Sequence, residues 1–301
     1  SYISHFWAPI TNLGNFYNQI IVAAAYLERI FETLDEPVAV QNADDAYALP
    51  PIRGEVEFEH VVFSYEKNIP VLKDISFRVK PGETIALVGP TGSGKTTVIN
   101  LLSRFYDISE GKILVDGHDT SKVTLESLRN QIGVMLQDTF IFSGTVMENI
   151  RYGRPDASDE DVIQAAKEVM AHEFIMEMEN GYQTEVNERG SRLSVGQRQL
   201  ISFARTLLSD PKVLILDEAT SSIDTRTEKA LQMALNRLLQ GRTSFIIAHR
   251  LSTIVNATRI FHISKGQINE AGSHEELMLQ QGDYYHLYMS QYKILYRDTA
   301  I

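Results

Sequence analysis

Cysteine is absent from the 301 residues of the chain, so a disulfide framework and a thiolate metal site are both excluded. A cytosolic location is compatible with this absence. Long apolar runs are absent as well. The longest candidate, IIVAAAYL at residues 20–27, is well short of the roughly 20 residues that span a bilayer. No signal peptide is visible, and the chain is expected to begin inside a helix.

Basic residues are outnumbered, with 28 lysines and arginines against 39 aspartates and glutamates and a net charge of −11. A nucleic-acid-binding surface carries a basic face or stripe, so this balance argues against nucleic acid as a partner. It does not exclude an anionic ligand that is held in one local pocket. The length and the hydrophobic share of 44% are typical of a globular protein with one large domain or two modest ones.

Residues 1–36 show apolar spacings of three and four, which predict a helix with a narrow apolar seam. Pro37 ends this helix, because the residue before a proline disfavours helical dihedrals. A polar linker over 37–53 follows. Spacing alone leaves two interpretations open: a surface helix packed on its own domain, or the cytosolic part of a longer helix. The members of the seam are Ile10, Leu13, Tyr17, Ile20, Ala24, Leu27, Phe31 and Leu34.

From residue 55 the apolar pattern changes to strands. EVEFEHVVFSY (55–65) and VLKDISFRV (71–79) alternate apolar and polar residues, as half-exposed antiparallel strands do. ETIALVG, KVLILD and TSFIIAH are short continuous apolar runs, which predict buried parallel strands. Because helical segments precede the latter two, the sequence indicates an α/β core. Residues 156–208 are expected to be mostly helical, and the last segment to form amphipathic helix.

The segment GPTGSGKT at 89–96 matches the phosphate-binding loop G-x-x-x-x-G-K-[ST], placed between a strand and a helix as that motif requires. Glycines let successive backbone N–H groups turn toward phosphate oxygens, and the following helix adds unpaired donors. Lys95 supplies a charge for the β- and γ-phosphates, and the Thr96 hydroxyl can bind Mg²⁺. The nucleotide-binding residues predicted here are Gly89, Pro90, Thr91, Gly92, Ser93, Gly94, Lys95, Thr96 and Thr97.

Two acidic residues follow the buried strand KVLILD. Open α/β sheets bind ligands at the carboxyl ends of their strands, so Asp217 and Glu218 are expected at such a site. Asp217 is predicted to hold Mg²⁺ through water. Glu218 is predicted to polarise the attacking water as a general base.

The segment RLSVGQRQ (192–199) opens a predicted helix upstream of that acidic strand. Together the three motifs resemble the nucleotide-binding domain of an ATP-binding cassette (ABC) transporter, whose signature LSGGQ is matched at four of five positions by Leu193–Gln197. The resemblance implies an α/β P-loop ATPase core with a mostly parallel sheet, an antiparallel β subdomain and an inserted helical subdomain. It also implies two cassettes that face head to tail around two ATP molecules. Ser194, Gly196 and Gln197 would then meet the partner's ATP.

Three further positions resemble the family's functional residues by their place in the sequence. Tyr65 resembles the aromatic residue that stacks on adenine. Gln137 resembles the glutamine that reaches Mg²⁺ and the attacking water, and His249 resembles the switch histidine at the γ-phosphate. The resemblance therefore implies Lys95, Gln137, Glu218 and His249 as catalytic residues, and Thr96, Gln137 and Asp217 as the Mg²⁺ site.

Some positions depart from the family pattern. Asp224 lies in SSID, where the family more often has SALD, and this segment resembles the loop that crosses to the partner's site. Asn187 replaces a glycine in TEVNERG, which resembles the segment that touches the coupling helices of the transmembrane domain, and Glu188 is kept. Val195 replaces the second glycine of the signature and restricts the backbone there. We hypothesise a heterodimer in which this altered signature faces the weaker site; a tolerated substitution in a homodimer is the alternative.

The segment IFSGTVMENI favours the exporters of the family, of the multidrug or lipid type. Residues 1–36 are then expected to be the cytosolic end of the last transmembrane helix, 37–53 a linker, and 54–301 the nucleotide-binding domain, with a helical subdomain near 140–208. The implied function is ATP hydrolysis that drives export, at the cytoplasmic face of the cell membrane.

Two other functions are alternatives to export. Soluble cassette ATPases of chromosomes or ribosomes tend to carry coiled-coil insertions, paired cassettes or basic surfaces, none of which this sequence shows. A non-catalytic module that uses ATP only as a clamp is the other alternative. Retention of Glu218 and His249 argues against it.

Overall fold

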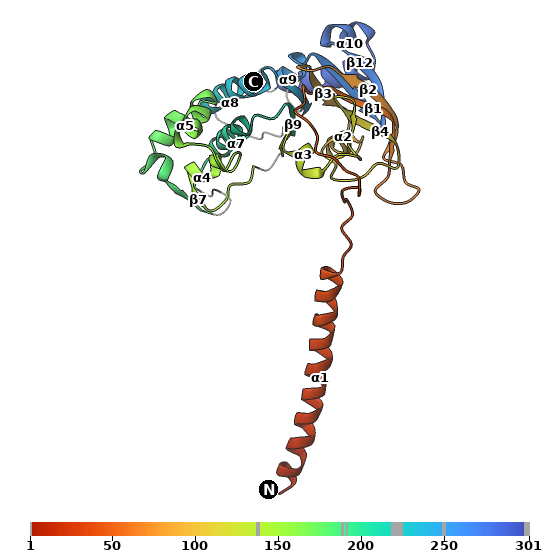
Figure 1. The fold of residues 1–301 in the computed structure, drawn as a ribbon, viewed down its shortest axis with the longest axis vertical. Helices are drawn as coiled ribbons and strands as arrows, with labels where there is room; N and C mark the ends of the chain where they lie inside the picture. Colours follow the sequence, from red (N-terminus) through yellow and green to blue (C-terminus); the bar gives the residue numbers. More distant parts are fainter. Residues whose placement is uncertain are drawn as a thin grey trace. The chain divides into compact units, whose positions relative to one another are not determined.

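The computed structural model describes residues 2–136, 139–187, 190, 192–217, 225–248 and 251–297 (Figure 1). The chain divides into two compact units, Ser1–Gln41 and Asn42–Ile301. The first unit holds the helix α1 (Tyr2–Leu34), which ends shortly before Pro37 as the sequence predicts. Among the described residues, none of the helices combines the length and apolar character that a bilayer span requires.

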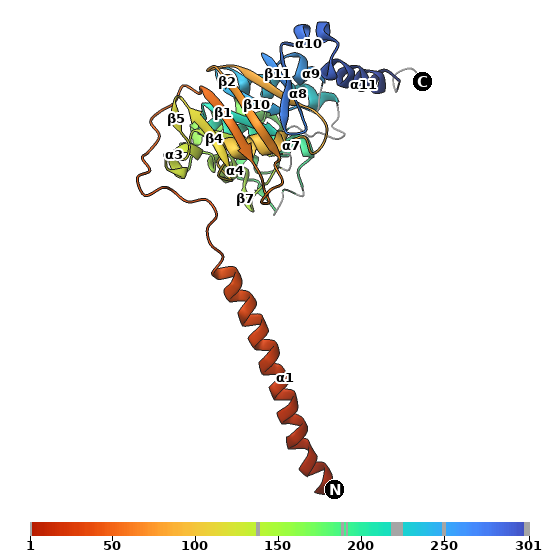
Figure 2. The same cartoon turned by 90° about the vertical axis from the view of Figure 1, so that its right-hand side faces the viewer.

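Two sheets form the framework of the second unit. Antiparallel strands in the order β2-β1-β4-β5 make the smaller sheet (Figure 2). The larger sheet has the order β12-β11-β3-β10-β9-β6. The smaller sheet contains β1 (Val56–Phe63), β2 (Leu72–Val79), β4 (Glu110–Val115) and β5 (His118–Asp119). The larger contains β3 (Thr84–Val88), β6 (Ile132–Met135), β9 (Val213–Asp217), β10 (Thr243–Ile247), β11 (Arg259–Ser264) and β12 (Gln267–Gly272).

The strand patterns in the sequence correctly predict both kinds of pairing. The alternating segments form the antiparallel pair β1 and β2. The continuous apolar runs form β3, β10 and β9, which pair in parallel. β12 adds an antiparallel edge to the larger sheet. Since β3 and β9 run in parallel with one strand between them, their carboxyl ends lie at the same edge.

Successive residues of the central strands enter different apolar clusters. Ile85 and Leu87 of β3 lie in a cluster with residues of the smaller sheet and of α2 (Lys95–Leu102). Ala86 and Val88 lie in the cluster that contains the other large helices. Side chains alternate between the two faces of a strand, so β3 is buried on both faces. Nearly every residue of β9 and β10 is buried as well, and this double burial is why the central strands appear as short apolar runs in the sequence.

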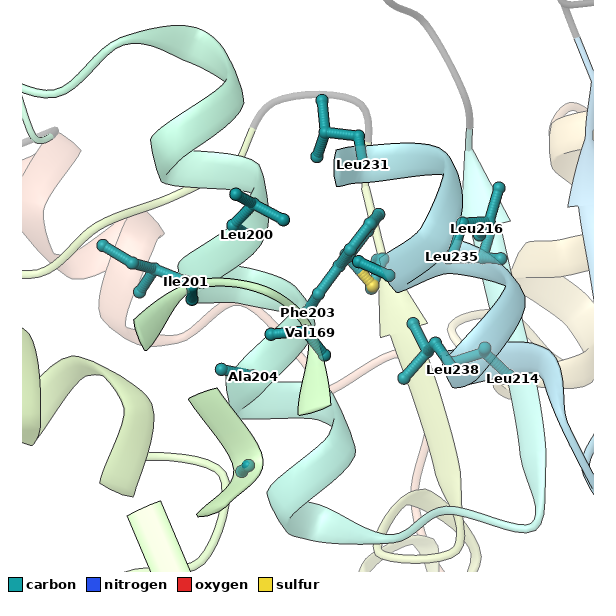
Figure 3. Packing of buried hydrophobic residues seen from close by; sticks show 14 of the residues in the cluster. Val169, Leu200, Ile201, Phe203, Ala204, Leu214, Leu216, Leu231, Leu235 and Leu238 are labelled. Carbon is teal, nitrogen blue, oxygen red and sulfur yellow. The ribbon is translucent and has the colours of Figure 1, made fainter. Parts of the chain in front are cut away.

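The helical part of the second unit packs on the larger sheet through α7 (Val195–Ser209) and α8 (Thr225–Leu239). Phe203 projects from α7 toward Leu231 and Leu235 of α8 (Figure 3). Leu216 of β9 belongs to the same cluster. The predicted helical stretch 156–208 is confirmed, with only the two-residue strand β8 (Glu185–Val186) among its described residues, paired to β7 (Gly144–Thr145). The remaining helices are α3 (Leu125–Arg129), α4 (Val146–Arg151), α5 (Asp159–Glu168), α6 (His172–Met176), the 3-10 turn Gly181–Gln183, α9 (Leu251–Val255), α10 (His274–Gln280) and α11 (Asp283–Arg297).

The boundary between the two units falls inside the predicted linker. Side chains of the second unit bind the backbone beyond it. Ser127 Oγ accepts a hydrogen bond from Leu49 N at 2.8 Å, and Gln131 Oε1 accepts one from Ile52 N at 2.9 Å. Asp116 Oδ1 accepts one from Gly54 N at 3.0 Å. These bonds explain why residues 42–53 belong with the sheets and not with α1.

Candidate functional site

The loop between β3 and α2 depends on its glycines. Gly89, Gly92 and Gly94 have φ values of 141°, 77° and 109°, a region that residues with a side chain rarely adopt. A Cβ on Gly89 would lie 2.1 Å from the carbonyl oxygen of Ile263, and one on Gly94 would lie 2.6 Å from the side chain of Leu72. The tight phosphate loop expected from the sequence is therefore formed, and it is packed directly against β11 and β2.

The mouth of α2 has the features of an anion site. The helix begins at Lys95, and its N-cap, Gly94, has no side chain that could cap the first turn. The first amides of a helix have no partner within it, and the helix dipole places positive charge at the same end. Thr96 is exposed here, whereas Thr97 is buried. This arrangement can bind a phosphate group.

Lys95 connects the loop to the acidic strand. Its Nζ donates hydrogen bonds to the carbonyl oxygens of Gly89, at 2.8 Å, and Pro90, at 2.9 Å. Burial lowers the pKa of Lys95, and the negative charge of Asp217 at the end of β9 acts in the opposite direction. Asp217 is thus close enough to Lys95 to affect its ionisation. The phosphate loop and the acidic end of β9, which are far apart in the sequence, therefore lie close together in the fold.

Ser93 and Gly266 add details of the loop that the motif alone does not contain. Ser93 Oγ is buried and has no hydrogen-bond partner among the described residues. Gly266, in the turn between β11 and β12, donates from its N to Ser93 O at 3.2 Å, and its own O accepts from Lys73 N at 2.8 Å. A Cβ on Gly266 would lie 2.1 Å from Val71 O. Sequence reasoning missed Gly266, which lies in none of the nucleotide-binding motifs; its φ of 79° and its close approach to Val71 are what require glycine there.

Tyr65 lies against the same helix. Its hydroxyl is 3.3 Å from Thr97 Oγ1, and its side chain is 48% exposed. The ring contacts Phe63 at the end of β1 and Tyr106 in the loop after α2. We call these three residues the aromatic corner. Tyr106 was not identified from the sequence, because no periodicity or motif relates it to Tyr65.

The signature segment begins α7 with a capping box. Ser194 Oγ accepts a hydrogen bond from Gln197 N at 3.2 Å, and Gln197 Oε1 accepts one from Ser194 N at 2.9 Å. Gly196 is buried and Val195 is 50% exposed. Ser194 and Gln197 therefore make an ordinary capping box at the start of α7. The Ser194 hydroxyl can still donate, and the first amides of α7 have no partner within the helix.

Several predicted site residues lie outside the described part of the chain: Gln137, Glu188, Glu218, Asp224 and His249. Among the predicted catalytic residues, Lys95 is described. The structure brings together Tyr65, Thr97, Lys95 and Asp217 around the phosphate loop. Ser194 and Gln197 make their hydrogen bonds within their own segment.

Known proteins resemble the chain over most of its length. A family model described as "ABC transporter" matches residues 72–221. An uncharacterized ABC transporter ATP-binding protein of Bacillus subtilis is 54% identical over 97% of this chain and 48% of its own length. A fatty acid ABC transporter ATP-binding/permease protein of Mycobacterium bovis is 48% identical over 95% of this chain and 45% of its own length. The chain spans about half the length of these relatives.

A solved structure agrees with the sequence relatives. The structure of a bacterial Atm1-family ABC exporter with ATP bound superimposes with a TM-score of 0.82 and 40% sequence identity, covering 96% of this chain and 51% of that one. The predicted α/β fold class is confirmed by this likeness and by the two sheets. The chain therefore belongs to the ABC transporter family, and it carries that family's ATP-binding domain, an ATPase.

Proposed function

We propose that this chain is the motor domain of a membrane exporter, which binds ATP with Mg²⁺, pairs with a second cassette and hydrolyses ATP to drive export. The observation that carries this proposal is the position of Lys95, held by two carbonyl oxygens of the phosphate loop and within electrostatic reach of Asp217. Relatives with names such as fatty acid transporter and lipid A-core flippase support export as the process that is driven.

In this proposal the residues of the site have different tasks. Lys95 binds the β- and γ-phosphates, exchanging neutral carbonyl acceptors for charged oxygens that form stronger hydrogen bonds. Glu218 takes the proton of the attacking water, so that ATP and water give ADP and phosphate. Gln137 orients that water and His249 contacts the γ-phosphate. Tyr65 stacks on adenine, for which a flat exposed ring is suited.

The donors at the loop fit Mg²⁺. Thr96 offers a hydroxyl in the first turn of α2 and Asp217 a carboxylate near Lys95, and Gln137 completes the proposed set. Among the described residues there is no group of three or more histidines and carboxylates that could hold a metal alone. Mg²⁺ typically uses one or two carboxylates together with substrate phosphates and water. Bound in this way, the ion supplies positive charge at the phosphates.

Asp217→Asn is expected to raise the Mg²⁺ concentration for half-maximal ATP hydrolysis by about 10- to 100-fold, the usual effect of losing a group that orients a metal's ligands. The measurement is the ATPase rate against Mg²⁺ at fixed ATP. Asp156→Asn, which removes an exposed carboxylate in the helical part, should leave the curve in place. An unchanged Mg²⁺ requirement in Asp217→Asn would contradict the proposed metal site.

The second cassette is proposed to meet the mouth of α7. The Ser194 hydroxyl and the first amides of the helix suit a phosphate of the partner's ATP. Val195, half exposed at this mouth, supports a heterodimer in which the signature of this chain faces the less active site. The site residues of this chain, with Glu218 and His249 both present, would then serve the more active one.

Val195→Gly is expected to raise turnover at the partner's site by about fivefold, the equivalent of roughly 1 kcal/mol of relieved backbone restriction. The measurement uses the heterodimer with Glu218→Gln in this chain, so that hydrolysis at the other site is observed. Val38→Gly, at an exposed valine of the first unit, is the control and should have no effect. Equal turnover with and without the Val195→Gly substitution would favour the tolerated substitution in a homodimer.

The remaining parts of the proposal concern the whole transporter. α1 is proposed to be the cytosolic end of the last transmembrane helix, joined by residues 37–53 to a nucleotide-binding domain at 54–301 whose helical subdomain is near 140–208. The domain would lie at the cytoplasmic face of the membrane. Residues 184–190 would contact the coupling helices. Support comes from relatives named ATP-binding/permease proteins, of which this chain covers half or less.

A further inference from the structure

The aromatic corner holds Tyr65 from two sides. The rings of Tyr65 and Tyr106 have centroids 5.0 Å apart and planes at 88°, and those of Phe63 and Tyr65 are 4.8 Å apart at 86°. Phe63 and Tyr106 also contact each other, at 5.7 Å. Perpendicular pairs at these distances are the favoured geometry for aromatic rings. The Tyr65 ring is thus fixed by two neighbours in addition to its hydroxyl contact with Thr97.

The three rings differ in burial. Phe63 is 3% exposed, whereas Tyr65 and Tyr106 are 48% and 42% exposed. Phe63 therefore anchors the corner, and Tyr65 keeps much of its surface available to a ligand. Residues 64–70 around Tyr65 belong to no strand or helix. A side chain on such a segment loses conformational entropy when a ligand orders it, and this loss weakens binding. A neighbouring residue that already orders the side chain in the free protein removes that entropy cost from binding.

Tyr106 is a suitable support because its own loop is tied to α2. Phe105 N donates to Asn100 O at 2.9 Å, and Arg104 N donates to Leu101 O at 2.9 Å. Arg104 is buried, and its Nη1 donates to Thr120 O and Val123 O. The loop that carries Tyr106 is fixed to the same helix whose other end follows the phosphate loop. A single rigid element therefore supports both the phosphate loop and the ring that contacts Tyr65.

We propose that Tyr106 is a positioning residue for the base of ATP: it holds the Tyr65 ring in the orientation that adenine requires, at a distance from the phosphate loop that α2 determines. This inference rests on the proposed role of Tyr65 in stacking on adenine. Tyr106 acts through Tyr65, so removing it affects the part of the affinity that comes from the base. The contribution of the phosphates does not depend on it.

The test compares ATP with inorganic tripolyphosphate, which has phosphates but no base. Both are titrated calorimetrically, with Mg²⁺, into the chain carrying Glu218→Gln, so that ATP persists. Tyr106→Ala is expected to weaken ATP binding by about 3- to 10-fold, the range for losing one aromatic pair, and to leave tripolyphosphate binding unchanged. Tyr106→Phe keeps the ring and should bind ATP as the parent does.

Phe105→Ala is the matched control. Phe105 is the sequence neighbour of Tyr106 and is also 42% exposed, but its ring lies 5.3 Å from the guanidinium of Arg129 and not against Tyr65. Its loss should leave the affinity for ATP unchanged. A Tyr106→Ala variant that weakens ATP and tripolyphosphate equally, or a Phe105→Ala variant with the same selective loss, would overturn the inference.

Tyr65→Ala distinguishes a failure of the positioning role of Tyr106 from a failure of the proposed stacking of Tyr65 on adenine. It should lose base-dependent affinity at least as strongly as Tyr106→Ala. The double variant should be no worse than Tyr65→Ala alone, because Tyr106 works through that ring. If Tyr65→Ala has no selective effect on ATP, the adenine site itself is wrongly placed. If Tyr65→Ala has this effect and Tyr106→Ala does not, only the positioning role fails.

Discussion

Replacing Glu218 with glutamine is expected to slow ATP hydrolysis by about 10²- to 10⁴-fold and to leave ATP affinity unchanged, as for the loss of a general base. The residue follows Asp217 in the sequence, and Asp217 ends β9 within electrostatic reach of Lys95. An amide has the shape of the carboxyl group, but it cannot accept the proton of the attacking water. Turnover and equilibrium ATP binding are measured on the same preparation.

Glu179→Gln is the control for this substitution, since it neutralises an exposed carboxylate in the helical part of the domain. It should hydrolyse ATP at the parental rate. Turnover near the parental rate in Glu218→Gln would refute the role of general base. A loss of ATP binding in Glu218→Gln would instead assign the side chain to holding the nucleotide.

The second large effect is expected for Lys95→Met, which should weaken ATP binding by about 10²- to 10⁴-fold. Lys95 Nζ already has two oxygen partners at 2.8 and 2.9 Å. Its proposed hydrogen bonds to phosphate are charged ones, each contributing about 1.5–3 kcal/mol. Losing two of them gives the stated range at about 1.4 kcal/mol for each factor of ten. Equilibrium binding of ATP with Mg²⁺ measures the loss.

Thermal unfolding distinguishes lost binding from lost folding in this variant. Burial lowers the pKa of Lys95, so its charge is partly desolvated in the free protein. Methionine removes this penalty together with the two hydrogen bonds of Nζ, so only a small change in the Tm is expected without ATP. Lys112→Met, at an exposed position on β4, is the matched control for binding. Parental ATP affinity in Lys95→Met would contradict the proposed phosphate site.

The central strands could be predicted from the sequence because the burial of a strand determines its pattern of apolar residues. The strands β3, β9 and β10, which are covered on both faces, appear as nearly continuous apolar runs, and β1 and β2 of the smaller sheet alternate. The phosphate loop could also be predicted, because the backbone conformation at three of its positions requires glycine. These features depend on neighbouring residues, so one short segment is enough to identify each.

What could not be predicted depends on contacts between distant segments. Gly266 must be glycine because the turn after β11 approaches Val71, and nothing near residue 266 shows this. Tyr106 matters through its contact with Tyr65, which lies on a different element. Ser194 and Gln197 illustrate another limit. The sequence analysis identified them only as signature residues, and the structure shows that they also form a capping box. Their contact with a partner's ATP stays a prediction.

Gln131 connects the start of the second unit to two strands of the larger sheet, through its side chain and its main chain. Its side chain binds the backbone at Ile52, while the main-chain carbonyl oxygen of Gln131 accepts hydrogen bonds from Lys212 N and Val213 N, at 3.1 and 3.3 Å. β6 and β9 start at this point, and the chain continues from them to Gln137 and Asp217. Ile52 is therefore connected to the first residues of both strands through a few hydrogen bonds of Gln131. This connection is far shorter than the path along the chain from residue 52 to residue 213.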